Sequence, residues 1–122
     1  MEARKLVELV EEPAHERGRM FYEAYINHPP SPSRRKKRVL LNIIAEEDDE
    51  ILVDQGLASL RQARILRLCR QAHEQGALLA YEDLTNLLLT SLSTIKRDLR
   101  LLRKQGLSVP IYRKKQRPIK ER

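Results

Sequence analysis

The sequence has few of the residues that secreted, membrane-spanning or metal-binding proteins use. It contains one cysteine, Cys69, so no internal disulfide is possible and a reducing compartment is favoured. Tryptophan is absent and aromatic residues make up 4% of the chain, which restricts the core mainly to Leu, Ile and Val. No apolar run approaches the roughly 18 residues of a membrane span, and the charged start MEARKLVELVEE is unlike a secretion signal. We therefore expect a cytoplasmic protein that is not embedded in a membrane.

The motifs that most enzymes and metal proteins need are also missing. None of the four glycines belongs to a phosphate-binding loop, and no nucleophile has a recognisable base. Cys69 and His73 are spaced i, i+4 and would supply half of a metal site, but there is no second pair with ligand spacing. A buried thiol beside a surface histidine is the simpler interpretation. We predict a protein that is not an enzyme and uses no metal or other cofactor, with no sign of a small-molecule ligand.

Positive charge is what the chain has in abundance, and it is clustered. The net charge is +7 over 122 residues. Residues 31–44 hold five bases and no acid, residues 91–106 hold five bases and one acid, and residues 107–122 hold six bases and one acid. Residues 45–56 hold six acids and no base. Clustered cations attract a polyanion at long range and release counterions from its phosphates, so a nucleic-acid partner is favoured.

The basic run at 91–106 coincides with a predicted helix. Ser91 is a suitable N-cap, and residues 92–105 contain no Gly or Pro before the stop at Gly106. Leu92, Ile95, Leu99 and Leu102 share one face of this helix, whereas the bases lie on the opposite face with one interrupting acid, Asp98. The predicted DNA-contacting residues are Ser91, Ser93, Thr94, Lys96, Arg97, Arg100, Arg103 and Lys104.

A second predicted helix, Tyr81–Leu89, precedes it after a very short join. Glu82 and Asp83 in its first turn complement the helix dipole, and its leucines form an apolar face. The join at Thr90 and Ser91 forces a steep crossing, as in a helix-turn-helix whose later helix enters a major groove. A strong helix over 57–75, ended by Gly76, would complete a three-helix unit.

These residues resemble known proteins. The stretch LTNLLLTSLSTIKRDLRLLRKQGL is similar to the recognition half of bacterial winged-helix repressors of the DeoR type. The matching residues are Ser91, Thr94, Ile95, Lys96, Arg97, Asp98, Leu99 and Gly106, whereas Leu89 replaces the Gly that many such motifs have at the turn. Residues 39–110 resemble a wider prokaryotic family of unknown function, which implies no activity. Its members continue beyond the end of this chain, so we expect a short relative or a fragment.

The remaining segments complete the predicted organisation. Residues 1–27 are predicted as an N-terminal helical extension with helices at 3–12 and 14–27, packed on the later domain or on a second copy. Residues 28–38 are predicted as a Pro-rich and basic linker, and residues 39–112 as the helix-turn-helix domain. Val39–Ile44 is a predicted strand, and the acids after it either cap a helix or lie against the basic segments and weaken off-target binding. Residues 113–122 form a basic tail.

The expected fold class is mainly α, a three-helix helix-turn-helix unit with a short strand. Residues 107–112 either form a small β-wing or continue into a flexible tail. The basic segments either contact phosphates or are only solvated. The candidate phosphate-contacting arms are Arg34, Arg35, Lys36, Lys37, Arg38, Arg113, Lys114, Lys115 and Arg117.

Two functions from different classes follow. The first is sequence-dependent binding of double-stranded DNA by a monomer or homodimer near the nucleoid, as a transcriptional regulator or a mobile-element accessory protein. Arg97 and Arg100 would read guanine, because an arginine fork bonds two acceptors there. The second is a protein-interaction or RNA-associated basic scaffold without sequence-specific DNA reading.

Overall fold

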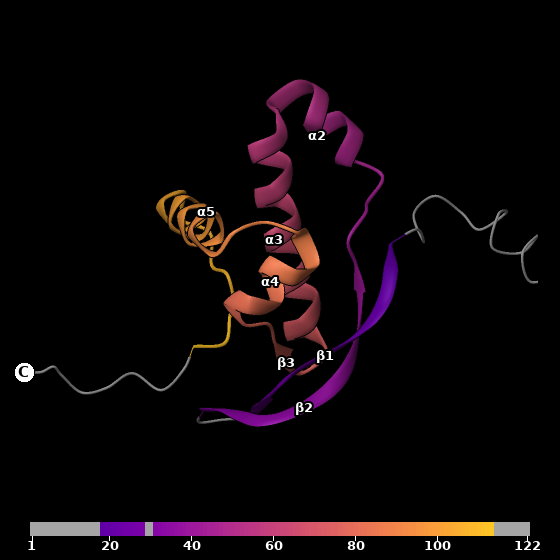
Figure 1. Ribbon diagram of the computed structural model, residues 1–122, viewed down its shortest axis with the longest axis vertical. Coiled ribbons are helices and arrows are strands. Elements are labelled where there is room, and N and C mark those ends of the chain that lie inside the picture. The colour runs from indigo at the N-terminus through magenta and orange to yellow at the C-terminus, as the bar shows by residue number, and fades with distance from the viewer. Residues whose placement is uncertain (1–17, 29–30, 114–122) are drawn as a thin grey trace, which may run out of the picture.

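The computed structural model describes residues 18–28 and 31–113, in which helices pack against a small antiparallel sheet (Figure 1). The elements in chain order are β1 (Arg19–His28), β2 (Ser31–Asn42), α2 (Asp48–Gln55), α3 (Leu57–Glu74), β3 (Ala77–Leu78), α4 (Tyr81–Leu88) and α5 (Leu92–Lys104). The strand order is β2-β1-β3, and both pairings are antiparallel. This is an α+β fold, so the predicted mainly α class with a three-helix unit is wrong.

The main error concerns β1, which was predicted as the helix over 14–27. Its residues alternate between two environments, since Ala24 is fully buried whereas Phe21 is 59% exposed. Tyr22 pairs with Val39 and Ala24 with Lys37 across the ladder to β2. Aromatic residues pack well on a pleated surface, and this tertiary pairing overrides the local helical pattern. The other predicted N-terminal helix, over residues 3–12, lies outside the described residues.

The segment predicted as a linker contributes most of β2. From Ser31 onward it pairs with β1, and Pro32 stands opposite Asn27 next to a register shift. A proline is tolerated there because β2 is an edge strand, where a missing N–H leaves no ladder bond unmade. The strand predicted at 39–44 is therefore the end of β2, and it pairs with β1 and not with a strand after α5.

The outer edge of β2 is covered by the side chains of Gln71 in α3 and of Gln75 at the C-cap of this helix. The Gln75 amide accepts a hydrogen bond from Leu40 N at 2.8 Å and donates one to Leu40 O at 2.7 Å. Gln71 Oε1 accepts a bond from Asn42 N at 2.8 Å. These bonds satisfy backbone groups that an edge strand otherwise exposes, and they fix the hairpin on α3.

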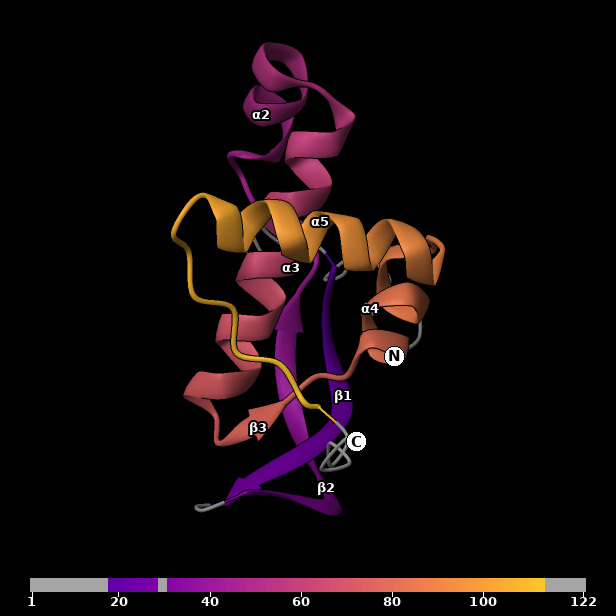
Figure 2. The ribbon, with the colours of Figure 1, turned by 90° about the vertical axis from the view of Figure 1, so that its left-hand side faces the viewer.

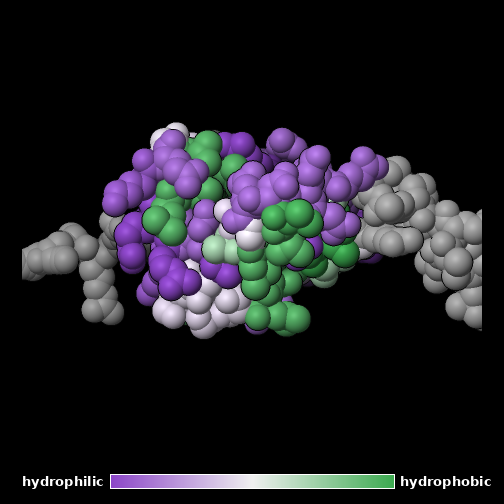
Figure 3. All heavy atoms as spheres, turned by 90° about the horizontal axis from the view of Figure 1, so that it is seen from above, coloured by the Kyte–Doolittle hydropathy of each residue, from purple (hydrophilic) through white to green (hydrophobic). Residues whose placement is uncertain are grey.

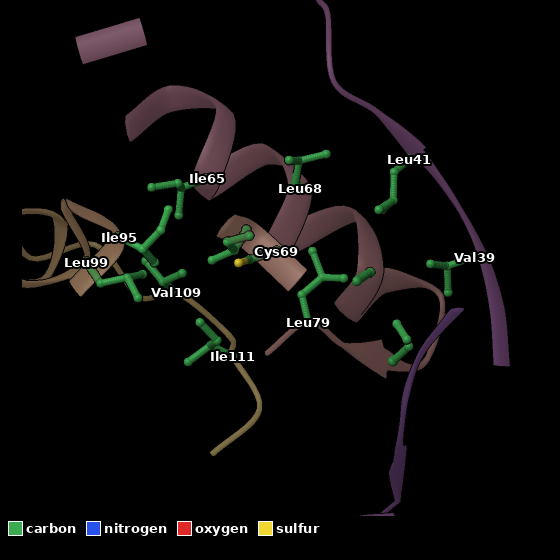
Figure 4. Close-up of a cluster of buried hydrophobic side chains, with 14 of the residues drawn as sticks. Val39, Leu41, Ile65, Leu68, Cys69, Leu79, Ile95, Leu99, Val109 and Ile111 are labelled. Carbon is green, nitrogen blue, oxygen red and sulfur yellow. The ribbon is translucent and has the colours of Figure 1, made fainter. Parts of the chain in front are cut away.

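α3 lies between the β1–β2 hairpin and α5, and the core forms on both of its sides (Figure 4). Val39 and Leu41 approach it from β2, whereas Ile95 and Leu99 approach it from α5 (Figure 4). The helices predicted over 57–75, 81–89 and 92–105 are confirmed to within one residue at each end. Their predicted apolar stripes are buried, except that Leu87 and Leu88 of α4 are partly buried and Leu92 of α5 is 42% exposed.

The acidic run after β2 begins α2, with Asp48, Asp49 and Glu50 in its first turn. Asp48 is buried and accepts a bond from Ala45 N at 3.0 Å, whereas the N-cap residue Glu47 makes no side-chain cap bond. It also forms ion pairs with Arg64 and Arg67 of α3, at 3.1 and 3.2 Å. Asp48 therefore joins α2 to α3.

The segment after α5 does not form the β-wing that was one of the two predictions. Residues 107–113 contain no strand. Val109 and Ile111 are buried in the core, and Tyr112 N donates to Leu79 O at 2.8 Å. β3 pairs instead with β1, which lies near the beginning of the chain.

Candidate nucleic-acid interface

α5 has one buried face and one cationic face. Ile95, Leu99 and Leu102 are buried against the rest of the fold. The five bases of the helix are all exposed, and none has an ion pair or hydrogen-bond partner among the described residues: Lys96, Arg97, Arg100, Arg103 and Lys104. An amphipathic helix of this kind presents a continuous positive surface to solvent.

The single acid of α5 does not belong to that surface. Asp98 is fully buried and forms an ion pair with Arg61 of α3, and Arg61 Nη2 lies 3.2 Å from Asp98 Oδ1. Gln62 Nε2 donates to the same oxygen at 3.1 Å. The carboxylate raises the pKa of Arg61, against the opposing effect of burial. The sequence suggested that Asp98 interrupts the row of exposed bases. In the fold Asp98 is buried, and its ion pair with Arg61 holds α5 against α3.

The N-terminus of α5 is capped as predicted. Ser91 Oγ accepts a hydrogen bond from Thr94 N at 3.3 Å and lies 2.9 Å from Thr94 Oγ1 and 3.2 Å from Ser93 Oγ. Ser91 and Ser93 are exposed and Thr94 is half-buried. The three hydroxyls thus gather at a helix end whose free amides favour an anion.

The turn before α5 has an uncommon backbone. Leu89 adopts φ +54° and ψ +50°, the left-handed conformation, although it is not a glycine. Its side chain is 91% exposed. The sequence already pointed to this position, because DeoR-type motifs often place Gly there. Leu89 therefore adopts the left-handed backbone conformation that glycine usually has at such a turn.

α3 separates most of the basic strand β2 from α5, and only the end of the hairpin reaches below α5 (Figure 1). Figure 2 shows α5 across the upper half of this face, the segment after α5 below it, and the end of the hairpin lowest. The five basic residues predicted as a phosphate-contacting arm, 34–38, are all exposed along β2. Arg113 is exposed at the end of the described chain. Successive side chains of a strand point to opposite faces, so these five bases are shared between the two faces of the sheet, and the arm residues Lys114, Lys115 and Arg117 lie outside the described residues.

Aromatic rings that were not predicted as functional accompany these cations. The Tyr25 and Tyr112 rings are stacked, with centroids 4.0 Å apart and planes 14° from parallel. The Lys36 ammonium lies 4.9 Å from the Tyr25 centroid, and the Arg38 guanidinium lies 4.2 Å from the Phe21 centroid. The alternation in RMFYEAYINH is the signal that would have placed Phe21 and Tyr25 on one side of a strand.

An open pocket of about 340 Å³ lies between this aromatic group and α5. Its lining includes Tyr25 and Tyr112 together with Lys96 from the first turns of α5. The pocket places the beginning of α5 next to Tyr25 of the hairpin.

The other sequence candidates have structural roles. Cys69 is buried, and burial together with the charge of Asp83 raises the pKa of its thiol to about 12. The thiol therefore stays protonated and unreactive at neutral pH. His73 is exposed, and the described residues contain no group of three or more His, Cys, Asp or Glu placed to hold a metal ion. In the same part of the chain, no helix has the length and apolarity to cross a bilayer.

Comparison with known proteins gives one finding, and it covers almost the whole chain. The family model DUF1670, described as a protein of unknown function, matches residues 4–117. The chain belongs to the DUF1670 family. No curated protein and no solved structure matches this sequence. The DUF1670 match is wider than the predicted resemblance over 39–110, and it includes the β1–β2 hairpin and the segment after α5.

Proposed function

We propose that this DUF1670 chain binds double-stranded DNA in a sequence-dependent manner, as a transcriptional regulator or a mobile-element accessory protein. α5 would enter the major groove, and the basic strand β2 would contact the flanking phosphates. On this proposal the protein acts at the nucleoid, in the cytoplasm of a prokaryotic cell. The DeoR-type resemblance of α5 supports this setting.

The observation that carries the proposal is the charge of the exposed side of α5. Its five bases face solvent, and its one acid is buried in the ion pair with Arg61. A surface that served only for solubility would gain from mixed charges. A helix that is uniformly positive and open on its outer face fits a groove bordered by two phosphate backbones.

The residues divide into two roles by their position on the helix. Arg97 and Arg100 lie near the middle of the exposed face, so we assign them to base edges, where the guanidinium fork recognises guanine. Lys96, Arg103 and Lys104 are assigned to phosphates. The hydroxyls of Ser91, Ser93 and Thr94 lie at the helix end, where phosphate contacts are common.

The test is selection from a random duplex-DNA pool by the purified full-length protein at near-physiological salt, with single-stranded RNA as competitor. Recovery of a short motif supports the proposal. Two half-sites about one helical turn apart would indicate a homodimer. Retention of duplexes without any motif would restrict the function to non-specific binding. No retention of duplexes would refute the proposal.

A second candidate is a protein-interaction or RNA-associated scaffold, and the apolar surface favours its protein-interaction form. Figure 3 shows hydrophobic atoms gathered among hydrophilic ones on the face that carries α2. Val53 is 81% exposed and Leu57 is 66% exposed at the junction of α2 and α3. Leu57 and Leu89 also line a second pocket of about 200 Å³. Exposed apolar groups of this kind mark interaction surfaces. Replacing Val53 and Leu57 with serine should leave duplex binding unchanged, unless a dimer is required.

A further inference from the structure

The pocket beside α5 has a lining that is unusual for a chain with so few aromatic residues. Three of the four tyrosines contribute to it: Tyr25, Tyr81 and Tyr112. Lys96 and Arg113 add two cations, and Glu82 adds one acid. The volume of about 340 Å³ lies within the range of small-ligand sites, which is roughly 300–1,000 Å³.

Each part of this lining has a chemical preference. Tyrosine rings offer flat apolar faces on which a planar heterocycle can stack, and their hydroxyls donate and accept hydrogen bonds. Lysine and arginine at the rim bind an oxyanion such as phosphate. The charges sum to +1, since two cations oppose one acid. A ligand that combines a planar ring with a single phosphate is a nucleotide unit.

We propose that this pocket receives one unpaired nucleotide of a single-stranded nucleic acid. The base would stack on the outer face of Tyr112, in the platform that this ring forms with Tyr25, and its phosphate would lie between Lys96 and Arg113. The platform already exists, because the two rings are stacked at 4.0 Å and need no rearrangement to offer a flat surface.

The surroundings favour a strand over a free nucleotide. Lys36 lies 4.9 Å from the Tyr25 centroid, and further along the same side of β1 the exposed Phe21 ring has Arg38 at 4.2 Å. Phe21 and Tyr25 are four residues apart on β1, so about 13 Å separates them. Alternating rings and cations along a strand are what single-strand binding surfaces use. A mononucleotide would occupy the pocket without contacting Phe21 or Arg38.

This inference does not depend on duplex binding by α5, although Lys96 belongs to both surfaces. The two surfaces adjoin, so a DNA with a single-stranded end next to a duplex would engage them together. Two binding surfaces that hold the same DNA raise its overall affinity, because binding at one surface increases the effective concentration at the other.

The experiment compares the full-length protein and its Tyr112→Leu variant for binding to a fluorescent single-stranded oligonucleotide, a blunt duplex and adenosine monophosphate. The loss of one stacking platform should weaken single-strand binding about tenfold and leave blunt-duplex binding unchanged. Tyr112→Phe keeps the ring and is the matched control, with single-strand binding retained. Equal weakening on both DNA forms, or no weakening, would overturn the proposal. Saturation by the monophosphate with the affinity of the oligonucleotide would also overturn it, because the pocket would then take a free nucleotide.

A second measurement needs no substitution and covers the case in which Tyr112→Leu fails to fold. A single strand that carries 5-iodouridine is photocrosslinked to the unchanged protein, and the modified peptide is sequenced. Crosslinks to Tyr25 or Tyr112 support the proposal, whereas crosslinks only to other residues contradict it. Arg100→Ala separates the two functions, since it should weaken duplex binding alone. Failure of the duplex proposal would therefore leave the single-strand result interpretable.

Discussion

Asp98 of α5 and Arg61 of α3 form a buried ion pair that determines which charges α5 shows to solvent. Asp98 has a side-chain exposure of 1% and Arg61 one of 19%, and Gln62 completes the bonding of the carboxylate. A carboxylate in that position would reduce the attraction of α5 for phosphate if it were exposed. The burial of Asp98 has two effects. Its ion pair holds α5 against α3, and the charged side chains that α5 exposes to solvent are all basic.

Removal of this pair should be costly to stability. Asp98→Ala leaves the Arg61 guanidinium and the Gln62 amide without the buried acceptor that they share. We expect a loss of about 3 kcal/mol in the free energy of unfolding, measured by chemical denaturation. Asp49→Ala is the matched control, since Asp49 is an exposed acid, and it should change stability by about 0.5 kcal/mol or less. Equal effects of the two substitutions would show that the pair contributes nothing.

α3, α4 and α5 were predictable from sequence, but α2 and the hairpin were not. α3 and α5 have apolar residues at strict helical spacing and end at Gly76 and Gly106, so local signals define them. In β1 the residues Met20, Phe21, Ala24 and Tyr25 fit a helical face as well as alternation. What decides between the two is the partner strand β2, and such pairing is invisible to a local window.

In the candidate site, too, local features were predictable from the sequence and contacts between distant residues were not. The exposed bases of α5 follow from its own periodicity. The burial of Asp98 depends on Arg61, 37 residues earlier in the chain, and the pocket depends on Tyr25, Lys96 and Tyr112 meeting in space. Contacts between distant residues depend on the tertiary arrangement, so a single sequence gave the charge of the surface and not its shape.

The contribution of Asp48 to stability should depend on pH. Burial alone would raise the pKa of Asp48, but the Ala45 N–H and the guanidiniums of Arg67 and Arg64 outweigh burial and lower it below 3.8. An acid with a lowered folded-state pKa stabilises the fold above its unfolded pKa and loses this effect as pH falls through the folded value. The stability advantage of the wild type over Asp48→Asn should therefore be constant above about pH 5 and decrease below pH 4. Urea denaturation at several pH values measures it, and an advantage that grows on acidification would contradict the assignment.

The turn between α4 and α5 should become more stable with glycine. Leu89 pays the steric cost of a left-handed conformation, about 1–2 kcal/mol, and its exposed side chain recovers little of it. Leu89→Gly removes that strain but adds entropy to the unfolded chain, so we expect a net gain of about 0.5 kcal/mol. Leu89→Ala keeps the strained backbone and removes the side chain, and it should be neutral. Thermal denaturation compares the two, and equal shifts would exclude strain as the cause.

The side chain of Gln75 should contribute more to the stability of the fold than a partly exposed residue usually does. Gln75→Ala removes both bonds to the Leu40 backbone and opens the edge of β2. We expect a loss of about 1–2 kcal/mol and increased aggregation at high protein concentration. Gln105→Ala, at an exposed glutamine after α5, is the control and should have neither effect. Unfolding in denaturant and light scattering measure the two consequences, and a loss no larger than that of the control would argue against edge protection.

The proposed division of labour on α5 makes the last prediction, which concerns salt and sequence together. If Lys104 binds a phosphate, Lys104→Gln should weaken binding to all duplexes alike and lower the slope of log affinity against log salt by about one. If Arg97 reads a base, Arg97→Ala should cost about 1–3 kcal/mol on the selected site and far less on a site altered at that position. Both side chains are exposed cations of one helix, so each variant controls for the charge lost in the other. Anisotropy titrations of the selected and altered duplexes at several salt concentrations give both quantities. A uniform loss for both variants would leave α5 as a phosphate-binding surface without base readout, because only a contact to a base edge depends on which base is present.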